Sequence, residues 1–315
     1  MGGDILDLYS KNLLVSTRKA AATGLSELAE GAISHDQIAR FLAGEELDGK
    51  FLRLKIKRLA RQYENREGCL VFDDTTVEKA YMDENEIVRW RYDHGKGRNA
   101  KGVNMLLAFH TAENECGKLQ TPIDCQIIAK TKTEADAKAG KERRMSGKSK
   151  NELMREMINQ TIQKHVRFGY IAADSWFASK ENMRFIQKKR KVFTFEISGD
   201  RLAAAREREG GQGRFAGIDR MEAPDEEPMP VYLKDLRFQA ILYKQVFKNR
   251  DGPAGVRCLA TNDETASGGR FKTPYKKRRS VDAHHESIKQ NASIGSSPAH
   301  TGRTQGNHIF ASIYA

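Results

Sequence analysis

Acidic residues directly follow two short apolar segments of this sequence. Asp73 and Asp74 come after Leu70–Phe72, and Asp174 comes after "YIAA". A single Asp in such a place most often begins a turn or caps a helix. Two carboxylates at the carboxyl ends of neighbouring strands lie where α/β sheets usually bind ligands. Because close carboxylates repel each other unless a cation separates them, the pair indicates a site for Mg²⁺, which prefers oxygen ligands.

A third candidate acid lies near the end of the chain, in "YKKRRSVDAHHESIKQNA" (275–292). Asp282 stands there in a run of basic residues, which are Lys276, Lys277, Arg278, Arg279, His284 and His285. Asp282 could simply neutralise these neighbours. It could also belong to a reaction centre surrounded by cations that bind phosphate. This stretch alone leaves both interpretations open.

The charge balance favours a polyanionic partner. Lys and Arg number 54 against 42 Asp and Glu, which gives a formal net charge of +12. Phosphate neutralisation by such cations drives binding to nucleic acid of any sequence, although many basic proteins have other roles. The chain has no apolar run of the length that spans a membrane and no signal-peptide pattern. Its four scattered cysteines lack a C-x-x-C pair, which predicts a cytoplasmic protein with reduced thiols.

Residues 1–66 are predicted to form a helical module. Ser34 and Gln37 have the spacing of a capping box ahead of an apolar helix face. The next helix, "DGKFLRLKIKRLARQY", carries six Lys or Arg among its apolar residues. It could contact DNA, as basic helices of small helical modules do. It could equally be an ordinary amphipathic helix with a solvated basic face.

Residues 67–315 are predicted to form a second, α/β domain. Alternation along the first strand would place Leu70, Phe72 and Asp74 on one face and Asp73 on the other. A β-rich insertion is expected at about 198–262, with an Asp251-Gly252 turn, and the apolar end of the chain suggests truncation. The order of elements is that of a mixed sheet flanked by helices, as in the ribonuclease-H-like fold. We expect strands at 69–72, 103–110, 122–129, 170–176 and 192–198, and helices at 150–166, 179–190, 274–291 and 305–315.

Several ordered motifs together resemble one family. The segments "DDTTVEKAY", "DENEIVRWRYDHGKGRNAKGVN", "YIAADSWFASKENM" and "YKKRRSVDAHHESIKQNA" look like those of DDE transposases of bacterial insertion sequences. In particular they resemble the subgroup whose last core helix carries a Tyr-x2-Arg-x3-Glu-x6-Lys signature. The likeness extends over nearly the whole chain.

The resemblance implies a ribonuclease-H-like catalytic domain with a three-carboxylate, two-metal site. By motif, the carboxylates are Asp74, Asp174 and Asp282, although one residue of register could exchange Asp74 for Asp73. The metal would be Mg²⁺, with Mn²⁺ as a substitute. Such a site cleaves double-stranded DNA at the element ends and joins the freed 3′-OH to target DNA, with one metal at the attacking oxygen and one at the leaving oxygen. A homodimer on DNA is expected by the same analogy.

The signature helix matches the family at three positions and departs from it at two. Tyr275, Arg278 and Lys289 match. Arg278 and Lys289 would hold DNA phosphates, and Tyr275 would bond a phosphate or orient an acid. Asp282 stands where the family has Glu, and Arg279 stands where Trp is expected. Asp reaches about 1 Å less far than Glu, and a shift of this size can abolish metal-dependent catalysis. Two functions therefore stay open, an active transposase and an inactive, decayed or truncated DNA-binding relative.

Overall fold

The computed structural model describes residues 2–16, 21–93, 97–136, 141–205, 215–248 and 254–315. Within these residues, eleven strands form one sheet in the order β10-β9-β11-β12-β13-β8-β7-β1-β3-β2, with β4 also paired to β3. A separate two-stranded sheet contains β5 and β6. The strands are β1 Cys69–Glu78, β2 Val88–Asp93, β3 Arg98–Asn114, β4 Gly117–Ile127, β5 Lys132–Asp136, β6 Lys141–Met145, β7 Tyr170–Ala173, β8 Val192–Ile197, β9 Leu202–Ala204, β10 Ala216–Gly217, β11 Pro228–Leu233, β12 Ala240–Lys248 and β13 Ala254–Thr261.

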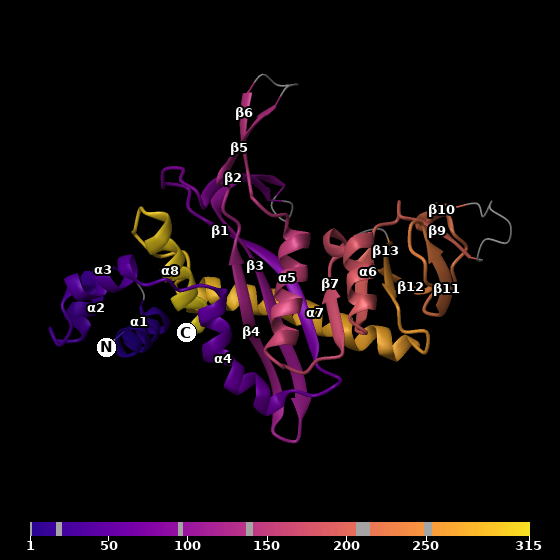
Figure 1. Cartoon of the computed structure of the whole chain (residues 1–315), viewed down its shortest axis with the longest axis horizontal. Helices are drawn as coiled ribbons and strands as arrows, with labels where there is room; N and C mark the ends of the chain where they lie inside the picture. Colours follow the sequence, from indigo (N-terminus) through magenta and orange to yellow (C-terminus); the bar gives the residue numbers. More distant parts are fainter. Residues whose placement is uncertain (1, 17–20, 94–96, 137–140, 206–214, 249–253) are drawn as a thin grey trace.

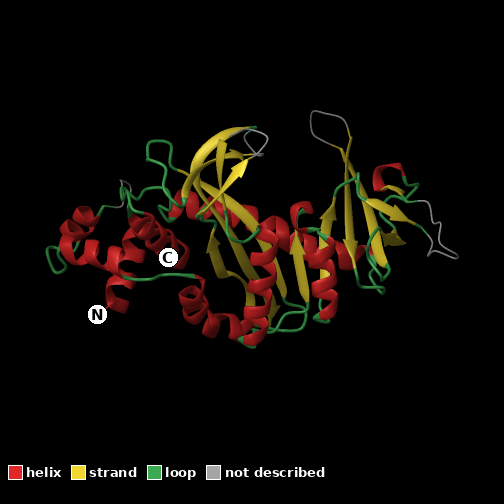
Figure 2. Ribbon diagram, turned by 45° about the horizontal axis from the view of Figure 1, so that its top comes forward, coloured by secondary structure: helices red, strands yellow, loops and turns green. Residues whose placement is uncertain are grey.

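Helices cover both faces of this sheet. They are α1 Gly2–Val15, α2 Ala22–Leu28, α3 His35–Gly44, α4 Gly49–Tyr63, α5 Lys150–Gln163, α6 Lys180–Lys188, α7 Gly268–Asn291 and α8 Gly302–Tyr314, with short 3₁₀ turns η1 Ser175–Phe177 and η2 Ile218–Arg220. In Figure 1, α5 and α6 lie in front of the sheet and the long α7 crosses behind it. Figure 2 shows the sheet continuing from β1 into the β-rich end of the molecule. The fold is therefore mixed α/β, as predicted.

The central strand β1 divides its side chains between two cores. Leu70 and Phe72 belong to the apolar cluster that contains α5 and α6 residues. Cys69 and Val71 belong to the cluster on the other face, with Val281 and residues of the terminal helices. This alternation follows from the period of two along a strand. It sends Asp74 toward α5 and Asp73 toward α7, which the structure confirms through their contacts.

The sequence suggested that Asp73 and Asp74 follow the end of the first strand, but in the structure both lie within β1. β1 continues to Glu78, because its antiparallel pairing with β3 runs from Cys69 to Glu78. Its parallel pairing with β7 ends earlier, at Val71. Asp73 and Asp74 therefore lie just beyond the point where the neighbouring strand stops. The sheet edge predicted for the ligand site is present, and it forms because β7 ends there while β1 continues.

Several other elements differ from the sequence prediction. β2, β5 and β6 occupy segments in which no strand was expected, and β2 shares the outer edge of β3 with β4. The predicted Asp251-Gly252 turn lies outside the described residues, although β12 and β13 on either side of it pair antiparallel as a hairpin requires. The strands between β8 and α7 extend the main sheet, since β13 pairs with β8.

The N-terminal helices pack on the C-terminal helix, so the two ends of the chain lie side by side (Figure 1). The buried ring of His308 on α8 joins them. Its Nδ1 accepts the hydroxyl of Tyr9 on α1 at 2.8 Å, and its Nε2 lies 3.0 Å from the carbonyl of Ser293. Since a carbonyl only accepts, Nε2 carries the proton and the ring is neutral.

Elsewhere, α4 packs on β4, where Arg53 forms a buried ion pair with Asp124. In the described part of the chain, no helix is long and apolar enough to cross a membrane.

His308 makes the docking of the chain ends sensitive to acid. Burial lowers its pKa from 6.5 to about 4. An unfolded chain takes up this proton near pH 6.5 and the folded chain only near pH 4, so stability is lost as the pH falls through that window. We expect the free energy of unfolding to drop by up to about 2 kcal/mol between pH 7 and pH 5 from this group alone.

Urea unfolding at both pH values, in the wild type and in His308→Gln, measures this effect. Gln can hydrogen-bond but does not titrate, so the variant should show the smaller pH dependence. Equal pH dependence in the two proteins would contradict the assignment.

Candidate active site

Asp174 begins the site at the end of β7. Its carboxylate caps the short η1 turn by accepting the backbone N–H of Trp176 at 3.0 Å. The side chain is half-buried, and burial is the main cause of its raised pKa. Arg278 opposes this rise, and the negative charge of Asp74 adds to it. The negative charge of Asp74 therefore reaches Asp174, so the two acids lie in one electrostatic environment.

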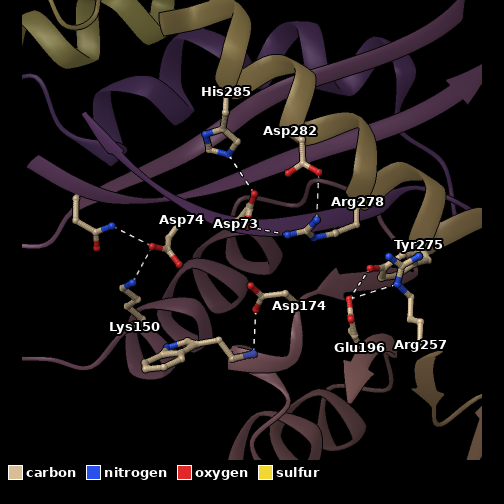
Figure 3. A network of polar contacts seen from close by, with 12 residues as sticks. Asp73, Asp74, Lys150, Asp174, Glu196, Arg257, Tyr275, Arg278, Asp282 and His285 are labelled. Carbon is tan, nitrogen blue, oxygen red and sulfur yellow. Dashed lines mark hydrogen bonds and ion pairs between the residues drawn. The ribbon is translucent and has the colours of Figure 1, made fainter. Parts of the chain in front are cut away.

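Asp74 faces α5. Its Oδ2 accepts a hydrogen bond from Asn104 on β3 at 2.9 Å and forms an ion pair with the Lys150 ammonium at 2.7 Å. Lys150 is the first residue of α5, whose N-terminus is fixed by the capping box of Ser149 and Glu152. The ammonium and the amide together hold one carboxylate oxygen of Asp74 in place (Figure 3).

Asp73 faces α7 and is buried, with only 7% of its surface exposed. It contacts the Arg278 guanidinium at 3.3 Å and lies 3.5 Å from Nε2 of His285. Burial lowers the pKa of His285 to about 3, so this ring is neutral and the contact is not an ion pair. Burial raises the pKa of Asp73 to about 7; Arg278 lowers it, while Asp174, Asp282 and Asp74 raise it. The charges of all three acids predicted as metal ligands therefore act on the pKa of Asp73.

Asp282 joins this group through Arg278. The guanidinium of Arg278 lies 3.3 Å from Asp282, one helical turn further along α7, and 3.3 Å from Asp73 on β1. Asp282 is the more exposed of these acids, with 59% of its side chain accessible. Figure 3 shows the result: Arg278 lies between Asp73 and Asp282, while Asp74 is held separately by Lys150.

The donor set suits a hard divalent cation. All the acids offer carboxylate oxygens, which are the ligands that Mg²⁺ and Mn²⁺ accept most readily. Burial is the main cause of the raised pKa values of Asp73 and Asp174, and the charges of neighbouring carboxylates add to it; a divalent cation would offset both effects. Two cationic side chains, Lys150 and Arg278, already lie against these acids. Across the described residues, however, no three His, Cys, Asp or Glu side chains are gathered closely enough to hold a metal ion as they stand.

The three matching residues of the signature helix are placed differently from one another. Tyr275 is buried, and its hydroxyl donates to Glu196 on β8 at 2.5 Å beneath the guanidinium of Arg257. Of the two roles open to Tyr275, orienting an acid is the one its contacts match. Arg278 forms ion pairs with Asp73 and Asp282. Lys289 lies exposed near the end of α7.

Four residues of this network were not identified from the sequence. Lys150 and Asn104 hold Asp74, and Glu196 and Arg257 hold Tyr275. Glu196 had a detectable signal, because it ends "VFTFE" much as Asp174 ends "YIAAD". The parallel register pairs Ala173 with Phe195, so it brings the next residues, Asp174 and Glu196, side by side. The other three are polar residues whose partners are set by the tertiary fold.

Comparisons with known proteins identify the family and the fold of this chain. Residues 4–249 match the family model described as DDE superfamily endonuclease. The structure is similar to the piggyBac transposase in a synaptic complex with hairpin DNA, with a TM-score of 0.53 and 12% identity over 99% of this chain. The chain spans 63% of the length of that protein, and at this identity the likeness shows the fold. The Drosophila P element transposase is more distant, with a TM-score of 0.31 and 12% identity over 60% of this chain and 36% of that one. No curated protein matches the sequence.

The contacts of Arg278 predict that it stabilises the protein. Replacing it with Met leaves Asp73 buried without its cation, and breaking a buried pair in this way costs about 3 kcal/mol. Replacing the exposed Lys289 with Met should change stability by less than about 0.5 kcal/mol. Urea unfolding of both variants measures the difference.

A double variant separates charge from packing. Adding Asp73→Asn to Arg278→Met removes the unpaired charge and should restore much of the lost stability. If Arg278→Met is as harmless as Lys289→Met, Arg278 does not hold the acids together.

Proposed function

The chain belongs to the DDE superfamily endonucleases, and on this premise we propose that it is a Mg²⁺-dependent DNA transposase of a bacterial insertion sequence. Family membership confirms the resemblance seen in the sequence. In this proposal the chain cleaves double-stranded DNA at the element ends and joins the freed 3′-OH to target DNA. It would act in the cytoplasm, at the nucleoid, as a homodimer on DNA.

One observation supports the proposal most strongly: near the edge where β7 ends, Arg278 contacts both Asp73 and Asp282, and the charges of Asp174, Asp282 and Asp74 all raise the pKa of Asp73. Asp74, Asp174 and Asp282 would hold the metal ions, which supply an activated attacking oxygen and stabilise the leaving oxygen. Asn104 fixes the orientation of Asp74. Glu196 fixes Tyr275 and with it the position of α7 over the sheet. Arg278 and Lys289 would contact DNA phosphates, Arg278 only after it leaves an acid.

We assign the first ligand to Asp74 rather than Asp73. Asp74 is partly exposed, with 24% of its side chain accessible, and its charge acts on Asp174. Asp73 is buried against Arg278 and His285. Its role in this proposal is to hold Arg278, and through Arg278 to position Asp282 on α7.

The N-terminal helices are proposed to extend the DNA interface. In α4, Lys55, Arg58 and Arg61 are exposed on the side away from its buried residues Leu52 and Ala60. Phosphate contacts from such a face add affinity without sequence preference. In this division of the chain, residues 1–66 bind DNA and residues 67–315 carry the chemistry.

A second candidate function is a DNA-binding protein without catalytic activity. It is favoured by the position of Asp282. This side chain is shorter than the family's Glu, and its contact in the structure is an ion pair with Arg278. An Asp that is held back from the metal site by about 1 Å would leave DNA binding intact and slow the chemical step severely.

Nicking of supercoiled plasmid that carries the DNA flanking the gene tests these two functions. We expect Mg²⁺-dependent nicking by the wild type, and a loss of more than about a hundredfold in Asp174→Asn and Asp74→Asn, since each removes a metal ligand. Asp73→Asn should retain more activity than Asp74→Asn.

Asp282→Glu decides between the candidates. Activity in the wild type supports an enzyme that works with Asp. Activity that appears only in Asp282→Glu identifies a decayed enzyme, and activity in neither protein supports the second candidate. Lys289→Gln serves as the control for weakened DNA binding, because it removes a charge far from the carboxylates along α7.

A further inference from the structure

A large aromatic side chain is exposed directly beside the acids. Trp176 follows Asp174 by two residues and has 62% of its surface accessible. The η1 turn fixes it there, because Phe177 is fully buried on the inner side of the turn. The carboxylate of Asp174 also accepts the backbone N–H of Trp176. The same carboxylate that serves the site therefore sets the position of the indole.

A cation lies between this indole and the acids. The ammonium of Lys150 lies 5.7 Å from the centre of the Trp176 ring and 2.7 Å from Oδ2 of Asp74. Its side chain is 23% exposed, so it can reach a ligand from where it stands. Trp176 and Lys150 come from η1 and from the start of α5, and a side-chain cap is present at the start of each of these two elements.

This pairing of groups matches the chemistry of one kind of ligand. An exposed indole stacks on the face of a nucleobase, and a neighbouring ammonium contacts the phosphate attached to it. In paired duplex DNA both faces of each base are covered by its neighbours. Only an unpaired base or a base at a strand end presents a face to an indole.

We propose that Trp176 and Lys150 form a binding subsite for an unpaired nucleotide of the DNA substrate, next to the phosphate held at the acids. The proposal rests on the proposed function in one respect, that DNA is the substrate. Stacking on Trp176 would fix the strand on the η1 side of Asp174. Lys150 would exchange Asp74 for a phosphate when that strand enters.

The chain contains its own matched control. It has two tryptophans, and the other, Trp90 on β2, is 55% exposed with the Lys101 ammonium 5.8 Å from its ring. Lys101 pairs with Trp90 and lies two residues from Val103, whose side chain belongs to the α7 face. Trp90 and Lys101 therefore lie on the opposite face of the sheet from Asp74. The two aromatic–cation pairs differ in location but hardly in chemistry.

Fluorescence and affinity measurements without divalent cations test the subsite, because cleavage is then excluded. The probes are a short, fully paired duplex and the same duplex with a central run of mismatched thymines. In Trp90→Phe, where only Trp176 emits, we expect the mismatched duplex to quench the emission. Trp176→Ala should bind the mismatched duplex about tenfold more weakly and the paired duplex unchanged. Trp176→Phe should retain most of the affinity because it keeps an aromatic face.

The controls separate this inference from the proposed function. Trp90→Ala should bind both duplexes like the wild type, and far-UV circular dichroism should show that every variant is folded. Equal losses on both duplexes in Trp176→Ala, no loss on either, or quenching that requires Trp90 would overturn the subsite alone. If the folded wild type binds neither duplex, the proposed function fails, and the subsite fails with it.

Discussion

The arrangement of this protein around its site depends on how several carboxylates are kept at one edge of a sheet. Asp73 and Asp74 leave β1 in opposite directions, and each is met by one cation, Arg278 from α7 and Lys150 from α5. Without these cations the acids would repel one another and resist burial. Because the cations come from helices on opposite faces, the same pairs also fix α5 and α7 relative to β1. The ion pairs that stabilise the acids are therefore also the contacts that hold these two helices against β1.

The sequence predicted what depends on local pattern. The period of two along "LVFDD" placed Asp73 and Asp74 on opposite faces, and the order of strands and helices gave the mixed sheet. The sequence could not show that β1 continues past its acids, since that length is set by pairing with β3. It also could not show that Arg278 pairs with Asp73, because a buried ion pair between α7 and β1 depends on long-range packing. The strand β2 was not expected because its aromatic residues Trp90 and Tyr92 are exposed, while the polar Arg89 and Arg91 alternate with them on the more buried side.

Asp282 is the residue on which the two candidate functions differ. Its partner Arg278 is also the partner of Asp73, so a change in one acid alters the cation that the other relies on. Trp176 and Lys150 approach the same group of acids from the α5 side. In the proposed function, α7 would therefore place the third acid, and the α5 side would carry the surfaces on which a DNA strand can rest.

The central claim is that these carboxylates form a site for divalent metal. Calorimetric titration of Mn²⁺ into the folded protein tests it without requiring any catalytic activity. The account predicts binding by the wild type that is lost in Asp174→Asn, strengthened in Lys150→Met because a competing cation is removed, and unchanged in Lys289→Gln. Mn²⁺ binding that is the same in Asp174→Asn as in the wild type would contradict it.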